Sequence, residues 1–135
     1  MRVVFVCLGN SCRSQMAEAW ARHLGAGRVE ALSAGVRALG FIATETREVM
    51  AEKGVSMDGQ RSKGFDAIDW PQVDVLVNMS GFPTRDVVPD FKGKCLDWKI
   101  ADPYMDPLET YRSVRDLLER KVRKLLEELP PAKQT

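Results

Sequence analysis

Short apolar runs alternate along the chain with stretches whose apolar residues recur at helical spacing. Residues 3–6 are apolar at every position and rich in β-branched side chains, so they predict a strand buried on both faces. From Ser14 the pattern changes to a helical period that continues to Leu24, and Gly25 ends it. The chain therefore begins with a buried strand that passes through a short polar loop into an amphipathic helix.

The same two patterns recur further along. Strands are predicted over 29–33, 73–79 and 95–98, and helices over 44–53, 108–129 and, as a short turn, 63–68. Residues 80–94 carry two prolines and two glycines among charged side chains, which predicts a long, mobile connection. Because strands alternate with helices, we predict a single-domain, doubly wound α/β fold, with a mostly parallel sheet covered on both faces. Ligands of such sheets bind beyond the carboxyl ends of the strands.

The last predicted helix is the most strongly amphipathic. One stripe along it is apolar and consists of Leu108, Tyr111, Val114, Leu118, Val122, Leu125 and Leu129. Its other face offers two ion pairs at a spacing of one helical turn, Asp116 with Arg120 and Glu119 with Arg123. Two prolines then end the helix, so we expect one domain over residues 1–129 and a flexible tail over 130–135.

Composition narrows the class of protein. The 135 residues suit one domain, and 20 basic against 19 acidic side chains leave a net charge of +1. This balance gives no basis for nucleic acid or a membrane as a partner. No apolar run approaches the roughly 18 residues of a membrane span, and the first residues do not resemble a secretory signal. An odd total of three cysteines argues against a disulfide scaffold and for a reducing, cytoplasmic location.

The loop between the first strand and the first helix carries the chemistry. Cys7 is followed by five residues and then Arg13. A tight loop lets successive backbone N–H groups bind an anion, and the helix that follows adds its positive end. Arg13 supplies a two-pronged donor, and the positive field favours Cys7 as a thiolate near neutral pH. Together these groups describe a nucleophile beneath a bound phosphate or a similar oxyanion.

A buried cysteine and a surface arginine at this spacing also occur by chance. The position between a buried strand and an amphipathic helix favours the oxyanion site, because the mechanism requires that context. With a single histidine, His23, no histidine-based metal site is expected. Glu18 fits a charge on a helix face better than a catalytic group.

Residues 6–14 read Val-Cys-Leu-Gly-Asn-Ser-Cys-Arg-Ser, followed by Met-Ala-Glu at 16–18. This loop resembles the signature of the low-molecular-weight protein tyrosine phosphatases and of the arsenate reductases that share their fold. Ser-Ala-Gly at 33–35 and Asp-Pro-Tyr at 102–104 match in order and spacing. The resemblance covers nearly the whole chain and implies a four-stranded parallel sheet with helices on both faces.

The resemblance also implies roles for the loop. Cys7 would attack phosphorus and form a phosphocysteine, and Arg13 would hold the equatorial oxygens. Ser14 would hydrogen-bond the thiolate, and the Asn10 side chain would tie backbone to backbone. The oxyanion-binding set would comprise Leu8, Gly9, Asn10, Ser11, Cys12, Arg13 and Ser14. No metal or other cofactor is implied.

Cleavage of a phosphate ester also needs a proton for the leaving oxygen, and Asp102 is the candidate acid. It follows a predicted strand, at the same edge of the sheet as Cys7, and Pro103 restricts its backbone. Without the resemblance, an Asp-Pro pair reads as an ordinary turn. With it, the set of nucleophile, anion loop and acid predicts a phosphomonoesterase of the phosphotyrosine type.

Two departures keep an arsenate reductase as the alternative. Phe41 and Tyr104 are the candidate substrate wall, but Met105 follows Tyr104 where the phosphatases usually have a second aromatic residue. Ser11 and the run from Gln15 look more like the reductase form of the loop. A third feature weakens the reductase alternative. The thioredoxin-coupled reductases have a further pair of cysteines after the third main strand, whereas this chain has only Cys95 near the end of that segment.

The two activities imply different partners. A phosphatase would act on a phosphorylated protein or a small aryl phosphate, and a reductase would need an external thiol donor. Cys12 is a candidate redox residue, because a reversible disulfide with Cys7 would protect the nucleophile; its alternative role is to fill space. Cys95 is the second redox candidate. A binding module without catalysis is the third reading, but binding alone would need neither Cys7 nor Asp102.

Overall fold

The computed structural model describes residues 1–130, which form a four-stranded parallel sheet flanked by helices. The strands are β1 (Arg2–Cys7), β2 (Glu30–Gly35), β3 (Val75–Asn78) and β4 (Lys94–Asp97), and their order is β2-β1-β3-β4. The main helices are α1 (Arg13–Leu24), α2 (Thr44–Glu52) and α4 (Leu108–Glu128). This architecture confirms the predicted fold class. Of the proposed tail, residues 131–135 lie outside the described part.

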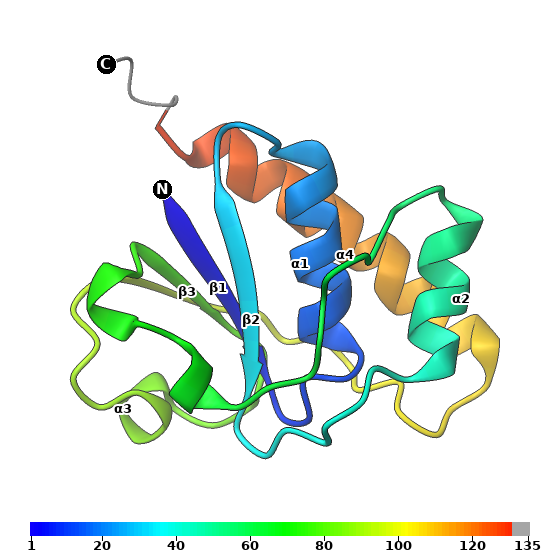
Figure 1. The fold of residues 1–135 in the computed structure, drawn as a ribbon, viewed down its shortest axis with the longest axis horizontal. Helices are drawn as coiled ribbons and strands as arrows, with labels where there is room; N and C mark the ends of the chain where they lie inside the picture. Colours follow the sequence, from blue (N-terminus) through cyan, green and yellow to red (C-terminus); the bar gives the residue numbers. More distant parts are fainter. Residues whose placement is uncertain (131–135) are drawn as a thin grey trace.

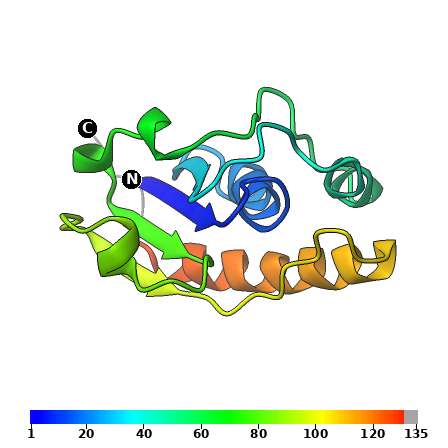
Figure 2. The same cartoon turned by 90° about the horizontal axis from the view of Figure 1, so that it is seen from below.

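The two faces of the sheet are covered unequally. One face packs its buried side chains against α1 and α4, and α2 packs against α4 in turn. The other face is covered by the short helices η1 (Phe65–Ala67), η2 (Trp70–Gln72) and α3 (Thr84–Val87). Figure 1 shows α1 and α4 on one side of the strands and α3 on the other. Figure 2 shows α4 running from the strands to α2.

Most boundaries lie within two residues of the prediction, and the larger differences have local causes. The connection over 80–94 is not irregular throughout, because α3 lies inside it. The side-chain amide of Asn78 organises its start, donating to the Phe82 carbonyl oxygen at 2.8 Å and to Thr84 Oγ1 at 3.2 Å. The short turn predicted over 63–68 is the three-residue helix η1.

Helix α4 buries the predicted stripe, including Tyr111, Leu118 and Val122, each at 0% exposure. Of its two predicted ion pairs, Glu119 with Arg123 forms at 2.9 Å. The other prediction was wrong, because Asp116 pairs with its neighbour Arg115 at 2.8 Å. The Arg115 guanidinium is buried against α2 and takes this carboxylate as one of its partners.

The sheet register determines where the site lies. Cys7, the last residue of β1, pairs with Gly35 at the end of β2, and Val6 pairs with Asn78 at the end of β3. The carboxyl ends of three neighbouring strands therefore meet beside the loop that follows Cys7. Segments that leave these strands supply the walls of the candidate site.

Candidate active site

The loop after β1 is prepared to bind an anion. Helix α1 begins at Arg13 with no side-chain hydrogen bond at its N-cap residue, Cys12, and with no acidic residue in its first turn. Within residues 1–130, none of the backbone N–H groups of residues 8–12 donates to a protein acceptor. Unpaired donors at the positive end of a helix favour an oxyanion at this point.

A chain of donors leads to the sulfur of Cys7. Cys7 Sγ lies 2.9 Å from Ser14 Oγ, which accepts a hydrogen bond from Asn10 Nδ2 at 2.8 Å. Asn10 is oriented from its other end, where Oδ1 accepts from the backbone N–H of Lys63 at 2.8 Å and from the Gln15 amide at 2.9 Å. Because the hydroxyl of Ser14 already accepts one bond, its own proton can be donated to sulfur, which stabilises a thiolate.

Asn10 therefore organises the loop in a different way from the one expected. Its side chain links the backbone of Lys63 to the hydroxyl of Ser14, whereas the prediction had it joining two stretches of backbone. Its φ of 49° lies in the left-handed region, which asparagine tolerates better than most residues. The residue thus supports both the turn of the loop and the orientation of the serine.

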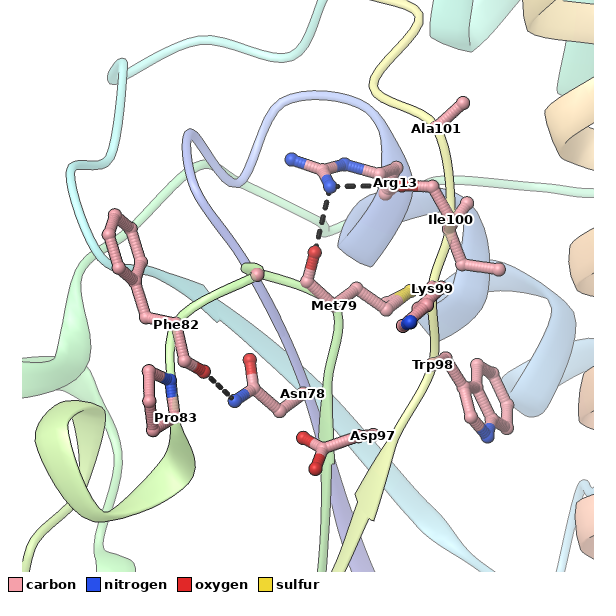
Figure 3. A pocket seen from close by; sticks show the side chains of 11 residues that line it. Arg13, Asn78, Met79, Phe82, Pro83, Asp97, Trp98, Lys99, Ile100 and Ala101 are labelled. Carbon is pink, nitrogen blue, oxygen red and sulfur yellow. Dashed lines mark hydrogen bonds between the residues drawn. The ribbon is translucent and has the colours of Figure 1, made fainter.

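Arg13 is held by backbone carbonyl groups at the ends of two other segments. Its Nη1 donates to the carbonyl oxygen of Met79 at 2.7 Å and to that of Ile100 at 3.2 Å, as Figure 3 shows. Its Nη2 lies 3.6 Å from a carboxylate oxygen of Asp102. The Nε atom is buried without a partner among the described residues. Nη1 is thus fixed, while Nε has no partner and Nη2 has only the longer contact with Asp102, so both can bind an oxyanion.

Asp102 lies in the same cavity as the nucleophile. The cavity has a volume of about 200 Å³ and is lined by Cys7, Leu8, Gly9, Ser11, Cys12, Arg13, Arg37, Leu39, Asp102 and Tyr104. The backbone N–H of Tyr104 donates to Asp102 Oδ1 at 3.1 Å, which fixes the carboxylate. The structure therefore brings together the three residues predicted to be catalytic, Cys7, Arg13 and Asp102.

The proposed wall is only partly as expected. Tyr104 lines the cavity, and the Phe41 ring packs beside it with 6.5 Å between ring centroids, but Phe41 is not itself among the lining residues. Leu39 takes that place. Leu39 and Arg37 were not identified from the sequence, although both follow β2, whose end is paired with Cys7. Position after a neighbouring strand was the signal that could have found them.

Of the other two cysteines, one is buried beside the catalytic loop and the other is exposed. Cys12 is buried, and its thiol lies 3.9 Å from the hydroxyl of Tyr111; burial raises the pKa of Cys12. Cys95 is exposed on β4, and the register places it two strands across and three residues back from Cys7. That offset amounts to about 14 Å between Cα atoms, about twice the span of a disulfide. The structure therefore does not bring Cys95 to Cys7.

Glu18 is a charge on the face of a helix, as expected, but that face is buried. It is 1% exposed, and its carboxylate accepts a hydrogen bond from Ser33 Oγ at 2.6 Å. Arg22 and Lys63 complete its surroundings, at 2.6 Å and 3.8 Å. Glu18 is buried because the face of α1 that carries it meets β2 and the segment around residue 63.

Two other kinds of feature are absent from the described part of the chain. Residues 1–130 contain no group of three or more His, Cys, Asp or Glu side chains placed to hold a metal ion. Among the same residues, no helix is long and apolar enough to cross a membrane.

Comparison with known proteins agrees with this geometry. The family model described as low molecular weight phosphotyrosine protein phosphatase matches residues 2–135. A glutaredoxin arsenate reductase of Synechocystis sp. is 33% identical over 93% of this chain and 95% of its own. A protein-arginine-phosphatase of Geobacillus stearothermophilus is 35% identical over 95% of each chain.

Solved structures of similar proteins have the same fold. An arsenate reductase in the phosphate binding state superimposes with a TM-score of 0.86 at 31% identity, covering 96% of this chain and 98% of that one. Structures named for phosphatase activity and structures named for arsenate reduction thus share this fold. The chain is an enzyme of the low molecular weight phosphotyrosine protein phosphatase family.

Proposed function

We propose that this enzyme is a phosphomonoester phosphatase of the phosphotyrosine type that acts through a phosphocysteine on Cys7. The observation that carries the proposal is the shared cavity of Cys7, Arg13 and Asp102. An anion-binding module would need the loop and Arg13 alone. An acid in the same cavity as the nucleophile has a use where a leaving group must be protonated.

In the first step, the sulfur of Cys7 attacks phosphorus and the bond from phosphorus to the ester oxygen breaks. The leaving oxygen takes a proton from Asp102 and departs as an alcohol or phenol. The N–H groups of the loop and the Nε and Nη2 atoms of Arg13 hold the three remaining oxygens, whose charge grows in the transition state.

In the second step, the Asp102 carboxylate takes a proton from a water molecule as that water attacks phosphorus. The S–P bond breaks, inorganic phosphate is released and Cys7 departs as a thiolate. The hydroxyl of Ser14, 2.9 Å from the sulfur, stabilises that leaving thiolate. Asp102 therefore acts first as the acid and then as the base.

The proposed reaction uses only groups of the chain. Arg13 and the loop supply the positive charge that a phosphoryl group requires, so no step calls on a metal or another cofactor. The substrates are a phosphorylated protein or a small aryl phosphate, in a cytoplasmic setting. Neither a nucleic acid nor a membrane takes part.

The experiment is steady-state hydrolysis of para-nitrophenyl phosphate by the wild type, Asp102→Ala and Cys7→Ser, with and without EDTA. We expect no turnover by Cys7→Ser and a loss of about 10²- to 10⁴-fold in kcat for Asp102→Ala. The chelator should change nothing. Feeble wild-type turnover that is indifferent to Asp102 would contradict the proposal.

Arsenate reduction is the second candidate, because Ser11 and Gln15 match the reductase form of the loop and relatives carry that name. The sulfur of Cys7 would then attack arsenic and form a sulfur–arsenic bond, while one arsenate oxygen takes up a proton and leaves as water. A second thiol would attack the Cys7 sulfur, yielding a disulfide and arsenite, so that two thiols supply the two electrons. Because Cys95 lies about 14 Å away, that second thiol would be Cys12, which lines the same cavity, or would come from an external donor. Thiol titration with arsenate separates the activities, since only the reductase consumes thiols stoichiometrically.

A further inference from the structure

A second cavity opens beside the catalytic one, next to the residues that follow β2. It has a volume of about 380 Å³ and is lined by Val36, Arg37, Phe65, Phe82, Asp86 and Val87. Arg37 also lines the cavity that contains Cys7, so the two cavities are direct neighbours. We call this second cavity the flanking pocket.

The floor of the flanking pocket is anchored in the fold. Phe65 and Val87 are half-buried and pack against the apolar cluster on the second face of the sheet. A parallel bridge joins Gly35 to Gly64, and it aligns the residues that follow each glycine, Val36 and Phe65. The two apolar walls are therefore fixed relative to β2 and so to the catalytic loop.

The rim of the pocket exposes apolar surface. Val36 is 37% exposed and Phe82 is 50% exposed. The backbone of Phe82 is nonetheless fixed, because its N–H donates to Ser80 Oγ at 3.1 Å and its carbonyl oxygen accepts from Asn78 Nδ2 at 2.8 Å. A third and larger cavity, of about 700 Å³, lies below Arg13, and Figure 3 shows Phe82 and Trp98 on opposite sides of it. Exposed apolar side chains on a fixed backbone beside an active site indicate a binding surface.

We propose that the flanking pocket binds a large apolar side chain of the phosphorylated polypeptide, near the phosphotyrosine. The inference rests on the proposed phosphatase function and names a determinant of its protein substrate. In an extended peptide, side chains two residues apart share a face and lie about 7 Å from one another. A peptide whose phosphotyrosine enters the catalytic cavity can therefore place a nearby side chain across Arg37 and into the pocket.

The composition of the pocket selects the class of side chain. Val36, Phe65, Phe82 and Val87 offer only apolar surface, and the two charged residues, Arg37 and Asp86, are exposed. A leucine or phenylalanine would cover the exposed rim, whereas a serine would leave it in water. Inorganic arsenate or phosphate has no group that reaches the pocket, so this feature belongs to a polypeptide substrate.

Binding to the inert variant Cys7→Ser tests the proposal separately from catalysis. The probes are fluorescent phosphotyrosine peptides whose other residues are serine and alanine. Each peptide carries a single leucine, at a different position in each, and its Kd is measured by fluorescence anisotropy. We expect leucine at one position near the phosphotyrosine to lower Kd about tenfold relative to serine there. Phe82→Ala and Val36→Ser, each in the Cys7→Ser background, should both abolish that preference. Phe91→Ala, the same truncation away from both cavities, should keep it.

The outcomes are distinct. The proposal that the flanking pocket binds an apolar side chain would be overturned by either of two results. One is an equal Kd for every peptide, and the other is a leucine preference that survives both Phe82→Ala and Val36→Ser. Two variants are needed because Phe82 also lines the larger cavity beside Arg13, whereas Val36 does not. Failure of the proposed function appears elsewhere, as absent hydrolysis of para-nitrophenyl phosphate by the enzyme that retains Cys7.

Discussion

The carboxylate of Glu18 and the ammonium group of Lys63 lie 3.8 Å apart, with side chains that are 1% and 11% exposed. Arg22 pairs with the other oxygen of the same carboxylate at 2.6 Å. The backbone N–H of Lys63 donates to Asn10, which in turn donates to Ser14 beside the nucleophile. A buried charge pair thus lies directly behind the residues that shape the oxyanion loop.

Removing one member of this pair should destabilise the protein more than removing both. Burial lowers the pKa of Lys63, and the Glu18 carboxylate opposes that effect. Lys63→Met leaves a buried carboxylate with only Arg22 and Ser33, so we expect a loss of about 2–3 kcal/mol in the free energy of unfolding. The measurement is urea denaturation of Lys63→Met, Glu18→Gln and the double variant. Losses that simply add in the double variant would show that the two side chains do not interact.

Gly35 allows β2 to approach the catalytic loop closely. A Cβ at this position would lie 2.9 Å from the backbone nitrogen of Asn10 and 2.9 Å from the carbonyl oxygen of Leu8. Because backbone cannot move aside as a flexible side chain can, Gly35→Ala should displace the loop. We expect kcat/KM for para-nitrophenyl phosphate to fall on the order of 10- to 100-fold, with a loss of about 1–3 kcal/mol in stability.

Gly64→Ala is the matched control, since a Cβ there would meet nothing within 4 Å and its φ of −91° suits alanine. We expect wild-type kinetics from that variant. If Gly35→Ala also retained wild-type kinetics, close approach at Gly35 would not be what positions the loop.

The parts that the sequence predicted well are those in which neighbours along the chain determine the outcome. Residues 3–24 contain a strand, a loop and a helix in succession, so Cys7 and Arg13 could be placed from local pattern alone. The carboxyl-edge rule showed that Asp102 could reach the same site, because the ends of parallel strands meet at one edge, but the family resemblance was needed to choose it over an ordinary turn residue. Contacts between segments distant in sequence were not predictable in this way. The burial of Glu18 depends on Lys63, and Arg37 enters the site only because β2 pairs with β1.

Glu52 should make the stability of the protein depend on pH in the acid range. Hydrogen bonds from Arg112 and Arg115 lower its pKa from 4.5 to about 2. A carboxyl group whose pKa is lower in the folded state contributes stability above its unfolded pKa and loses it as the pH falls toward the folded value. The Tm difference between the wild type and Glu52→Gln should therefore be constant above pH 5 and shrink between about pH 4.5 and 2.

Glu48→Gln serves as the comparison, because Glu48 is exposed on the same helix and forms no ion pair within residues 1–130. Its Tm difference from the wild type should stay small and lack the same acid dependence. A Tm gap for Glu52→Gln that stays constant down to pH 2 would mean that the two arginines do not stabilise the Glu52 carboxylate.

Ser14→Ala should affect the chemistry of Cys7 directly. The Ser14 hydroxyl accepts from Asn10 Nδ2 at 2.8 Å and lies 2.9 Å from Cys7 Sγ, so its proton is available to the sulfur. Losing a hydrogen bond to a charged group costs about 1.5–3 kcal/mol, which corresponds to a fall of roughly 10- to 100-fold in rate. The fall should be largest in the second step, because there the thiolate is the leaving group.

Two readouts separate this role from a merely structural one. The rate of alkylation of Cys7 by iodoacetamide should fall in Ser14→Ala, because the sulfur loses a hydrogen-bond donor that favours the reactive thiolate. Rapid mixing with para-nitrophenyl phosphate should show a burst of nitrophenol followed by slow turnover, as phosphocysteine accumulates. Ser113→Ala, an exposed serine on α4, should leave both measurements unchanged. An alkylation rate for Ser14→Ala that equals that of the wild type would show that the serine does not stabilise the thiolate.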